Sequence, residues 1–339
     1  MYFYLNDMNN RLIWADSIKG WLILLVIIGH CIASIIGNDA ANLDYWWCLI
    51  YSFHMPAFIA ISGYLNYRGG GNQINPIRVD VIIKRRLQQL IVPFLNWSII
   101  MYAVKNNITS FYQCILQPTK SFWFLWALFF IVASFTILDY FSKKTKIKQE
   151  TIMGVTCVGC AVTMIIFKDI RIFGIQYVLY YFIFYCLGFY INKYHLFTEK
   201  KLLIMLMVIS WLLLASFWKP RELPSFIPLS GGIAIMFRFA YKFIVANVAI
   251  FAMFSIAPKV LNSHGKFNQL ISKIGAVSLG LYTFHLTFVN QIVLFVKSYI
   301  ENNVIVFFLS FLLLSILSYF IVTLLGKQKC AARLLLGKV

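Results

Sequence analysis

The sequence alternates long apolar runs with short polar connections. Each run is close to the ~20 residues that an α-helix needs to cross the hydrocarbon core of a bilayer. We therefore predict an all-α, polytopic integral membrane protein with about ten transmembrane helices, forming a single transmembrane domain over residues 1–339. The predicted spans cover residues 18–36, 46–66, 88–104, 121–140, 151–167, 173–191, 202–218, 230–256, 275–296 and 303–325.

The composition excludes an ordinary soluble protein. Hydrophobic residues make up 61% of the chain and charged residues only 12%, whereas roughly a quarter of the residues of a soluble chain are charged. The first apolar run is followed by neither a small-residue cleavage site nor a soluble domain, so we expect a retained span rather than a signal peptide.

The formal net charge of +19 follows the membrane topology. With the N-terminus inside, the inner segments hold 21 Lys and Arg residues and the outer loops hold 7. This bias obeys the positive-inside rule and predicts that both termini are cytoplasmic. We expect membrane lipid rather than nucleic acid as the partner of these charges, in the inner (plasma) membrane of a bacterium.

The first span carries ionisable residues into an apolar setting. Eleven residues separate Lys19 from His30, which is three helical turns plus about 20°, so the two share a face about 16 Å apart. Asp16 lies on nearly the same stripe and can pair with Lys19 at the i,i+3 spacing. The pattern indicates a site along this side of the helix.

Three histidines, at positions 30, 54 and 285, lie within predicted spans. Ionisable residues inside a membrane usually face a cavity or a polar partner. We expect Pro56 to kink the second span and to tilt His54 toward such a cavity, where it can meet His30. A desolvated imidazole favours the neutral form, which can accept a proton from a hydroxyl. The alternative is a structural role, with each ring bonded to a neighbouring carbonyl.

Basic residues lie at the inner ends of two spans. Lys19 and the cluster formed by Lys84, Arg85 and Arg86 suit a cytosolic ligand that carries phosphates. The alternative for the cluster is that it satisfies topology and binds anionic lipid. Arg238 and Lys242, one turn apart in a predicted span, either contact an anionic acceptor or pair with a buried acid such as Asp139.

Other signals have simpler interpretations. The seven cysteines lie mostly in apolar runs, and we interpret them as buried thiols, including Cys157 and Cys160, which have the spacing of a redox pair. Three histidines could form a zinc site, but nothing local fixes that geometry, and we expect no metal. The proline-containing outer loop at 219–228 is either a stiff connector or a lid.

Several motifs resemble those of the membrane acyltransferase-3 family, and most of all its fucose 4-O-acetylase and sugar O-acetyltransferase branch. The two most specific are Asp16-Ser-Ile-Lys19-Gly20…Gly29-His30 and Phe53-His54-Met55-Pro56 with Ile61-Ser62-Gly63-Tyr64. Weaker matches are Arg85-Arg86-Leu-Gln-Gln-Leu-Ile-Val-Pro93, Phe122-Trp123-Phe124-Leu125-Trp126 and Ser278-Leu-Gly-Leu-Tyr-Thr-Phe-His285.

The resemblance implies transfer of an acetyl or similar acyl group from cytosolic acyl-CoA to a sugar hydroxyl on a glycan or lipid-linked glycan precursor. It implies that His30 is the essential catalytic histidine, with His54 and Asp16 as further catalytic candidates. Lys19, Arg85, Arg86 and Trp123 are then candidates for binding acetyl-CoA, and Ser62, Tyr64, Arg238, Lys242 and His285 for binding the acceptor. Gln89 departs from the family pattern, which usually has a second arginine at this position.

We expect His30, with His54, to take the proton of an acceptor hydroxyl that arrives from the outer side, so that its oxygen attacks the acyl carbon. Because no Ser or Cys is obviously placed beside His30, we favour direct transfer over an acyl-enzyme. Two rival classes are a transporter or flippase of lipid-linked sugars and a non-catalytic scaffold. Against the first, the sequence shows no repeated half; a scaffold would not need three intramembrane histidines.

Overall fold

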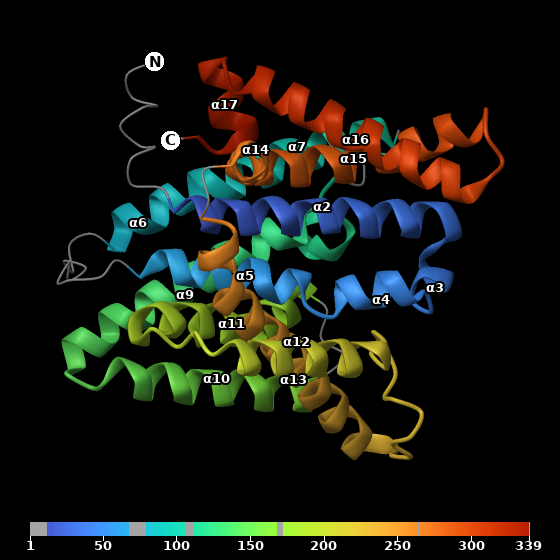
Figure 1. The fold of residues 1–339 in the computed structure, drawn as a ribbon. Helices are drawn as coiled ribbons and strands as arrows, with labels where there is room; N and C mark the ends of the chain where they lie inside the picture. The colour runs from blue at the N-terminus through green and yellow to red at the C-terminus, as the bar shows by residue number, and fades with distance from the viewer. Residues whose placement is uncertain are drawn as a thin grey trace. The chain divides into compact units, whose positions relative to one another are not determined.

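The computed structural model describes residues 12–67, 79–105, 107, 111–167, 172–262 and 265–338. Every regular element within these ranges is a helix (Figure 1), which confirms the all-α prediction. The predicted cytoplasmic segment before residue 12 lies outside the described residues. The uninterrupted long helices are α2 (Ile13–Ile36), α9 (Trp123–Thr145), α10 (Gln149–Ile166), α11 (Ile175–Tyr194), α13 (Gly231–Val260), α15 (Ser278–Lys297) and α16 (Asn303–Leu325).

Two further spans are composite. One consists of α4 (Tyr45–Tyr51) and α5 (His54–Asn66), and the other of α6 (Val79–Arg86), the π-helical η2 (Leu87–Ile91) and α7 (Val92–Val104). In the described ranges, nine spans are thus long and apolar enough to cross a membrane. The predicted span at 202–218 corresponds to α12 (Lys201–Ser216), which is apolar but shorter than the others.

Short helices complete the described chain, and the sequence pattern predicted none of them. Two of them, α14 and α17, are amphipathic rather than apolar throughout, which is why they fall below the signal for a span. The short elements are α3 (Asn38–Ala41), α8 (Gln113–Leu116), η4 (Pro118–Lys120), η5 (Ile172–Gly174), α14 (Lys266–Ala276) and α17 (Lys329–Leu336).

The second predicted span is interrupted just before its proline, Pro56. Helix α4 ends at Tyr51 and α5 begins at His54, with Ser52 and Phe53 in a turn between them. Pro56 has no N–H to donate to the carbonyl of Ser52, and its ring would clash with that carbonyl in a regular helix. The kink that we predicted is therefore present, and it lies immediately before His54.

The contacts group the described helices into two units. The first comprises residues 1–61 and 197–319, and the second comprises residues 62–196 and 320–339. In the first unit, α2 packs against α4, α13, α14 and α15. In the second, α9 packs against α6, η2, α10 and α11, while α17 packs on α7. The chain passes between the units within α5, between α11 and α12, and within α16. A single domain over 1–339 stays a prediction.

Helix α14 crosses α2 at very close range in the first unit. A Cβ atom on Gly275 would lie 1.8 Å from the carbonyl oxygen of Asp16, and one on Gly20 would lie 2.2 Å from that of Ile271. Small residues at a helix crossing let two backbones approach each other. The pair of glycines therefore fixes α14 against the part of α2 that carries Asp16.

We predict that Gly275→Ala destabilises the protein by about 1–3 kcal/mol, because the methyl group has to push one backbone away from the other. The measurement is thermal unfolding in detergent or nanodiscs. Gly154→Ala is the matched control, since a Cβ at this helical position on α10 meets nothing within 4 Å. Equal unfolding temperatures for the two variants would contradict the tight crossing.

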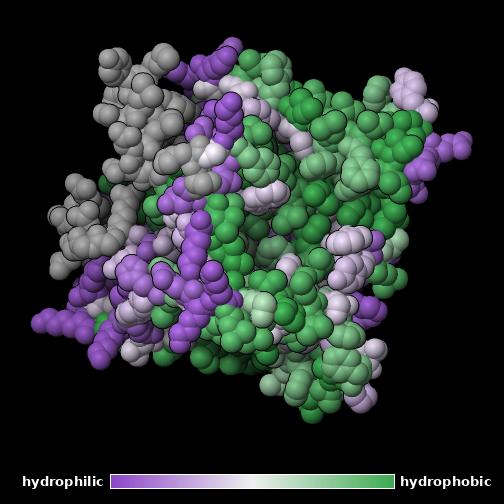
Figure 2. Space-filling view, in the orientation of Figure 1, coloured by the Kyte–Doolittle hydropathy of each residue, from purple (hydrophilic) through white to green (hydrophobic). Residues whose placement is uncertain are grey.

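Helix α16 shows how the apolar surface is divided between core and lipid. Its exposed side chains recur every fourth residue, and its buried side chains follow the same spacing on another stripe. The exposed stripe contains Val304, Phe308, Leu312, Ile316 and Phe320, and the buried one contains Val306, Ser310, Leu314, Ser318 and Val322. Much of the visible surface is likewise hydrophobic (Figure 2), as a surface in contact with lipid tails would be.

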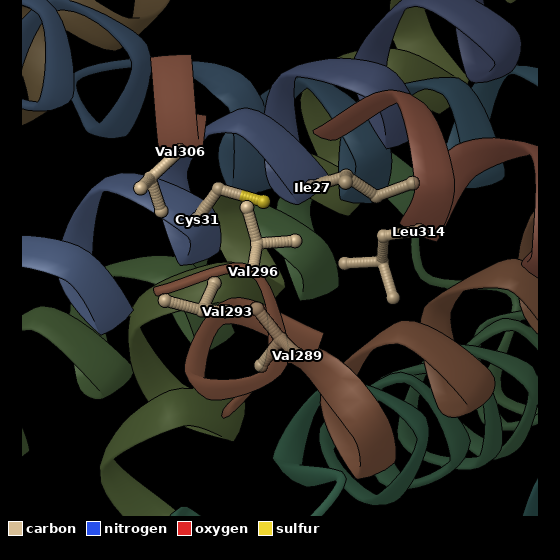
Figure 3. Packing of buried hydrophobic residues seen from close by; sticks show 7 residues of the cluster. All are labelled: Ile27, Cys31, Val289, Val293, Val296, Val306 and Leu314. Carbon is tan, nitrogen blue, oxygen red and sulfur yellow. The ribbon is translucent and has the colours of Figure 1, made fainter. Parts of the chain in front are cut away.

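The core beside α2 is built from α2, α15 and α16. Ile27 and Cys31 of α2 pack against three valines of α15 and against Val306 and Leu314 of α16 (Figure 3). Cys31 is fully buried, and Figure 3 shows its sulfur turned into this cluster. This thiol therefore acts as a small apolar side chain, as predicted. All seven cysteines are free.

Candidate active site

Three helices of the first unit bring His30, His54 and His285 into one cluster. The rings of His30 on α2 and His285 on α15 have their centroids 5.4 Å apart. The ring of Tyr51 on α4 lies 6.4 Å from that of His30 and 4.6 Å from that of His54. Tyr51 thus contacts both rings and links His30 to His54; direct contact between the two histidines stays a prediction.

Local structure explains why Tyr51 and His54 face this point. Asp44 caps the start of α4 by accepting a hydrogen bond from the backbone N–H of Trp47 at 2.8 Å. One turn later, the ring of Tyr51 stacks on that of Trp47 with centroids 3.6 Å apart. His54, three residues after Tyr51 and just beyond the turn at Ser52 and Phe53, lies with its ring 4.6 Å from that of Tyr51.

Gly29 allows the ring of Tyr51 to lie directly against α2. A Cβ atom at this position would be 2.6 Å from Cε2 of Tyr51, well inside van der Waals contact. The glycine that precedes His30 therefore sets the distance between α2 and the aromatic ring that contacts both histidines.

We predict that Gly29→Ala lowers kcat for acyl transfer about tenfold, because the displaced Tyr51 ring shifts His30 and His54 from their working geometry. Steady-state kinetics measure the effect. Gly159→Ala, at a helical position with nothing within 4 Å, is the control and leaves kcat unchanged. Unchanged kinetics in Gly29→Ala would show that the Tyr51 contact does not matter for the reaction.

Two of the three histidines have a defined tautomer. Nδ1 of His54 lies 2.7 Å from the carbonyl oxygen of Ile50, and Nδ1 of His285 lies 2.7 Å from that of Leu281. A carbonyl oxygen can only accept, so each Nδ1 carries the proton and each neutral ring keeps a lone pair on Nε2. Such bonds to neighbouring carbonyls are what a purely structural role for the histidines predicts. They nevertheless leave both Nε2 atoms able to accept a proton.

His30 differs from its two partners. His54 is 2% exposed and His285 is fully buried, whereas His30 keeps an intermediate exposure. No hydrogen bond ties the His30 ring to a backbone carbonyl of the described chain. It is therefore the most exposed of the three histidines.

Asp16 and Lys19 form an ion pair one turn apart, with 2.5 Å between carboxylate and ammonium. The Lys19 side chain is 23% exposed, so it can offer its charge to a ligand. About 21 Å of helix axis separates Asp16 from His30, which is too far for direct contact. Asp16 therefore acts on Lys19 through the ion pair, and its membership of the catalytic group stays a prediction.

Arg238 and Lys242 hold the outer loop of the first unit. Arg238 donates to the carbonyl of Arg221 at 2.8 Å, and Lys242 donates to the carbonyl of Pro220 and lies over the Trp218 ring. The suggested partner Asp139 is instead bound by Lys143 and by Gln149. The suggested pairing with Asp139 was therefore wrong, because both cations bind carbonyls of the loop. These bonds hold the loop in place, as expected for a connector rather than a lid.

The remaining candidates lie in the second unit. Arg85 is exposed, and Arg86 donates to Oε1 of Gln89 at 2.9 Å. Trp123 stacks on Tyr177 and Tyr181, with centroids 4.3 and 5.3 Å away. That Arg85, Arg86 and Trp123 bind the acyl donor together with Lys19 stays a prediction.

Ser62 and Tyr64 lie on α5 beyond His54. Tyr64 is buried, and its carbonyl accepts a hydrogen bond from the side chain of Asn192 at 2.8 Å. Ser62 is partly exposed. Their role in binding an acceptor stays a prediction.

Sequence reasoning missed Tyr51 and Trp47. Trp46 is 65% exposed, as an interfacial tryptophan would be. Trp47 is 8% exposed and supports Tyr51 at the i,i+4 spacing. The available signal was a tyrosine three residues before an intramembrane histidine. In the described ranges, no group of three or more His, Cys, Asp and Glu residues is arranged to hold a metal ion.

Comparisons with known proteins show which proteins the chain is similar to. Two nodulation proteins named NolL are each 30% identical to the chain, one from Mesorhizobium japonicum over 191 residues and one from Sinorhizobium fredii over 192 residues. The alignments cover 53% of this chain and 48% and 49% of the relatives, so the chain spans about half the length of the curated relatives it matches. No solved structure matches the chain.

A family model described as an acyltransferase domain matches residues 12–326, which include every helix from α2 to α16. The match contains all three histidines of the cluster and both composite spans. The resemblance predicted from the motifs is thereby confirmed. The chain is a multi-pass membrane protein that belongs to the acyltransferase-3 family.

Proposed function

We propose that this protein is a membrane O-acyltransferase that moves an acetyl or similarly short acyl group from cytosolic acyl-CoA to a sugar hydroxyl. The acceptor is a cell-surface glycan or a lipid-linked glycan precursor, and the membrane is the inner membrane of a bacterium. The observation that carries the proposal is the cluster in which Tyr51 contacts His30 and His54 while His285 contacts His30, inside the spans of a chain from an acyltransferase family.

His30 acts as the general base in this proposal. A ring nitrogen of His30 takes the proton of the acceptor hydroxyl while the oxygen attacks the thioester carbon of the donor. The O–H and C–S bonds break, the new C–O ester bond forms, and CoA leaves as a thiolate that receives the proton from His30. The burial of the surrounding rings excludes water, which would otherwise compete with the sugar hydroxyl for the acyl group.

Direct transfer fits the surroundings of His30 better than an acyl-enzyme does. Cys31 follows His30 in the chain, but its thiol lies in the apolar core with Ile27 and Val293. Successive residues of a helix point about 100° apart, so the neighbour of His30 cannot share its face. The acceptor oxygen itself is thus the proposed nucleophile.

The donor is proposed to bind with its phosphates near Lys19. About 16 Å of helix axis separates Lys19 from His30, so an extended pantetheine arm along α2 would carry the thioester toward the histidines. Asp16 orients the Lys19 ammonium through the ion pair at 2.5 Å. Arg85 and Arg86 are proposed to add charge for the same phosphates.

The acceptor side is proposed to involve His54, Ser62 and Tyr64. His54 has its Nδ1 proton committed to Ile50, which leaves Nε2 to accept a hydrogen bond from a sugar hydroxyl. Arg238 and Lys242 contribute indirectly, by holding the outer loop.

The test is incubation of the purified protein with labelled acetyl-CoA and a mixture of cell-envelope glycans, with CoA binding measured in parallel. The proposal predicts label in a glycan ester that mild base releases. Binding of CoA without transfer into any glycan of the mixture would contradict the proposed acceptor class. A well-folded protein that neither binds CoA nor transfers label would contradict the proposal as a whole and favour a transporter.

A further inference from the structure

One nitrogen in the histidine cluster has no partner. Nε2 of His285 is buried and accepts no hydrogen bond in the structure, while Nδ1 of the same ring donates to Leu281. His285 is fully buried on α15, so bulk water does not satisfy this lone pair. A buried acceptor without a donor is costly. It is therefore expected to meet a donor in some state of the protein.

His30 is the neighbour that can supply this donor. The centroids of the two rings lie 5.4 Å apart, with the ring planes inclined at 48°. Small rotations at this spacing bring two ring nitrogens to a hydrogen-bond distance of about 2.7–3.2 Å. The His30 ring lies between the rings of Tyr51 and His285, and no backbone carbonyl of the described chain takes its N–H.

No acidic residue of the described chain forms an ion pair with His30. Among the residues that the structure describes, the ion pairs of Asp and Glu go to lysine or arginine, and none goes to His30 or His285. A catalytic histidine needs a partner on its second nitrogen, because that partner selects the tautomer and orients the ring. In this cluster, the available acceptor is the lone pair of His285.

We propose that His285 is a positioning residue whose Nε2 accepts the N–H of His30 and so holds the other nitrogen of His30 toward the acceptor hydroxyl. This inference rests on the proposed function, in which His30 is the base. The bond also stabilises the imidazolium that forms when His30 takes the proton. His285 itself neither gains nor loses a proton in the step, because its own Nδ1–H stays on Leu281.

Two variants of His285 separate this role from simple packing. In His285→Asn, the side-chain amide can still donate to the carbonyl of Leu281, but it does not reach the position of Nε2. In His285→Gln, the amide oxygen reaches that position and can accept the N–H of His30. We expect His285→Asn to lower kcat about 100-fold without changing KM for acetyl-CoA, and His285→Gln to recover at least a tenth of the wild-type kcat.

A spectroscopic measurement gives a second readout that does not depend on turnover. The chain has only 5 histidines, so ¹⁵N-histidine labelling gives few signals, and a His30→Gln variant assigns that of His30. We expect a single neutral tautomer of His30 in the wild type and in His285→Gln, and a mixture of tautomers in His285→Asn.

The outcomes distinguish this inference from the proposed function. Wild-type kcat in His285→Asn, or equal losses in the Asn and Gln variants with no change of the His30 tautomer, would overturn the positioning role while leaving His30 as the base. Full activity of His30→Ala would instead overturn the proposed function. Thermal unfolding of each variant verifies that the fold is retained.

Discussion

His30→Ala is expected to lower kcat for acyl transfer by at least about 10³-fold. Removal of a general base typically costs 10²–10⁴-fold, and the upper part of this range applies here because the other two imidazoles of the cluster, His54 and His285, are buried. The affinity for acyl-CoA should change little, since the proposed phosphate ligands lie about 16 Å along α2. Single-turnover transfer at saturating donor, together with CoA binding, measures both quantities.

Ser34→Ala is the matched control for this experiment. Ser34 lies one turn beyond His30 on α2 and donates to Asn290 of α15, so its loss perturbs the same pair of helices without touching the base. We expect its kcat to stay within about twofold of the wild-type value. If the two variants lost activity equally, the loss in His30→Ala would reflect packing of α2 rather than proton transfer.

Lys19→Gln is expected to raise KM for acyl-CoA by about 10–100-fold while kcat at saturation changes little. A charge-assisted bond to phosphate contributes about 1.5–3 kcal/mol, which corresponds to this range. The variant also removes the ion pair between Lys19 and Asp16, so thermal stability should fall as well. Lys19→Arg keeps the charge and should retain most of the donor affinity.

Lys201→Gln is the control for Lys19. It removes a lysine from the start of α12, on the predicted cytoplasmic side of the same unit, without removing one from α2. KM for acyl-CoA should stay unchanged. A fall in kcat with unchanged KM in Lys19→Gln would place Lys19 in the chemical step and would remove it from donor binding.

The features that the sequence predicted well are local ones. Each apolar run is helical, two of them in more than one segment, because a run of this length and composition has few alternatives in a membrane. The break before His54 follows from the missing N–H of Pro56, and the pair of Asp16 with Lys19 follows from helical spacing. That His30 and His54 lie in the same cluster could be predicted because their spans are joined by a short connection.

The features that the sequence did not predict depend on contacts distant in the chain. The amphipathic helix α14 is too short to resemble a span, and only the structure shows that its Gly275 lies against α2. Similarly, no local pattern shows that Arg238 and Lys242 reach carbonyls of the outer loop instead of Asp139. His285 lies 255 residues beyond His30, so only the packing of α15 on α2 brings their rings together.

The most direct test of the proposed acyl transfer from acetyl-CoA to a glycan uses sealed vesicles in which every copy of the protein has the same orientation. Labelled acetyl-CoA is supplied on the cytoplasmic face alone, and both the label in the glycan and the movement of unmodified glycan across the bilayer are followed. We expect labelled glycan to accumulate only when acetyl-CoA is on the cytoplasmic face, and not in the His30→Ala variant. Movement of unmodified glycan without any incorporation of label would contradict the enzyme and identify a transporter.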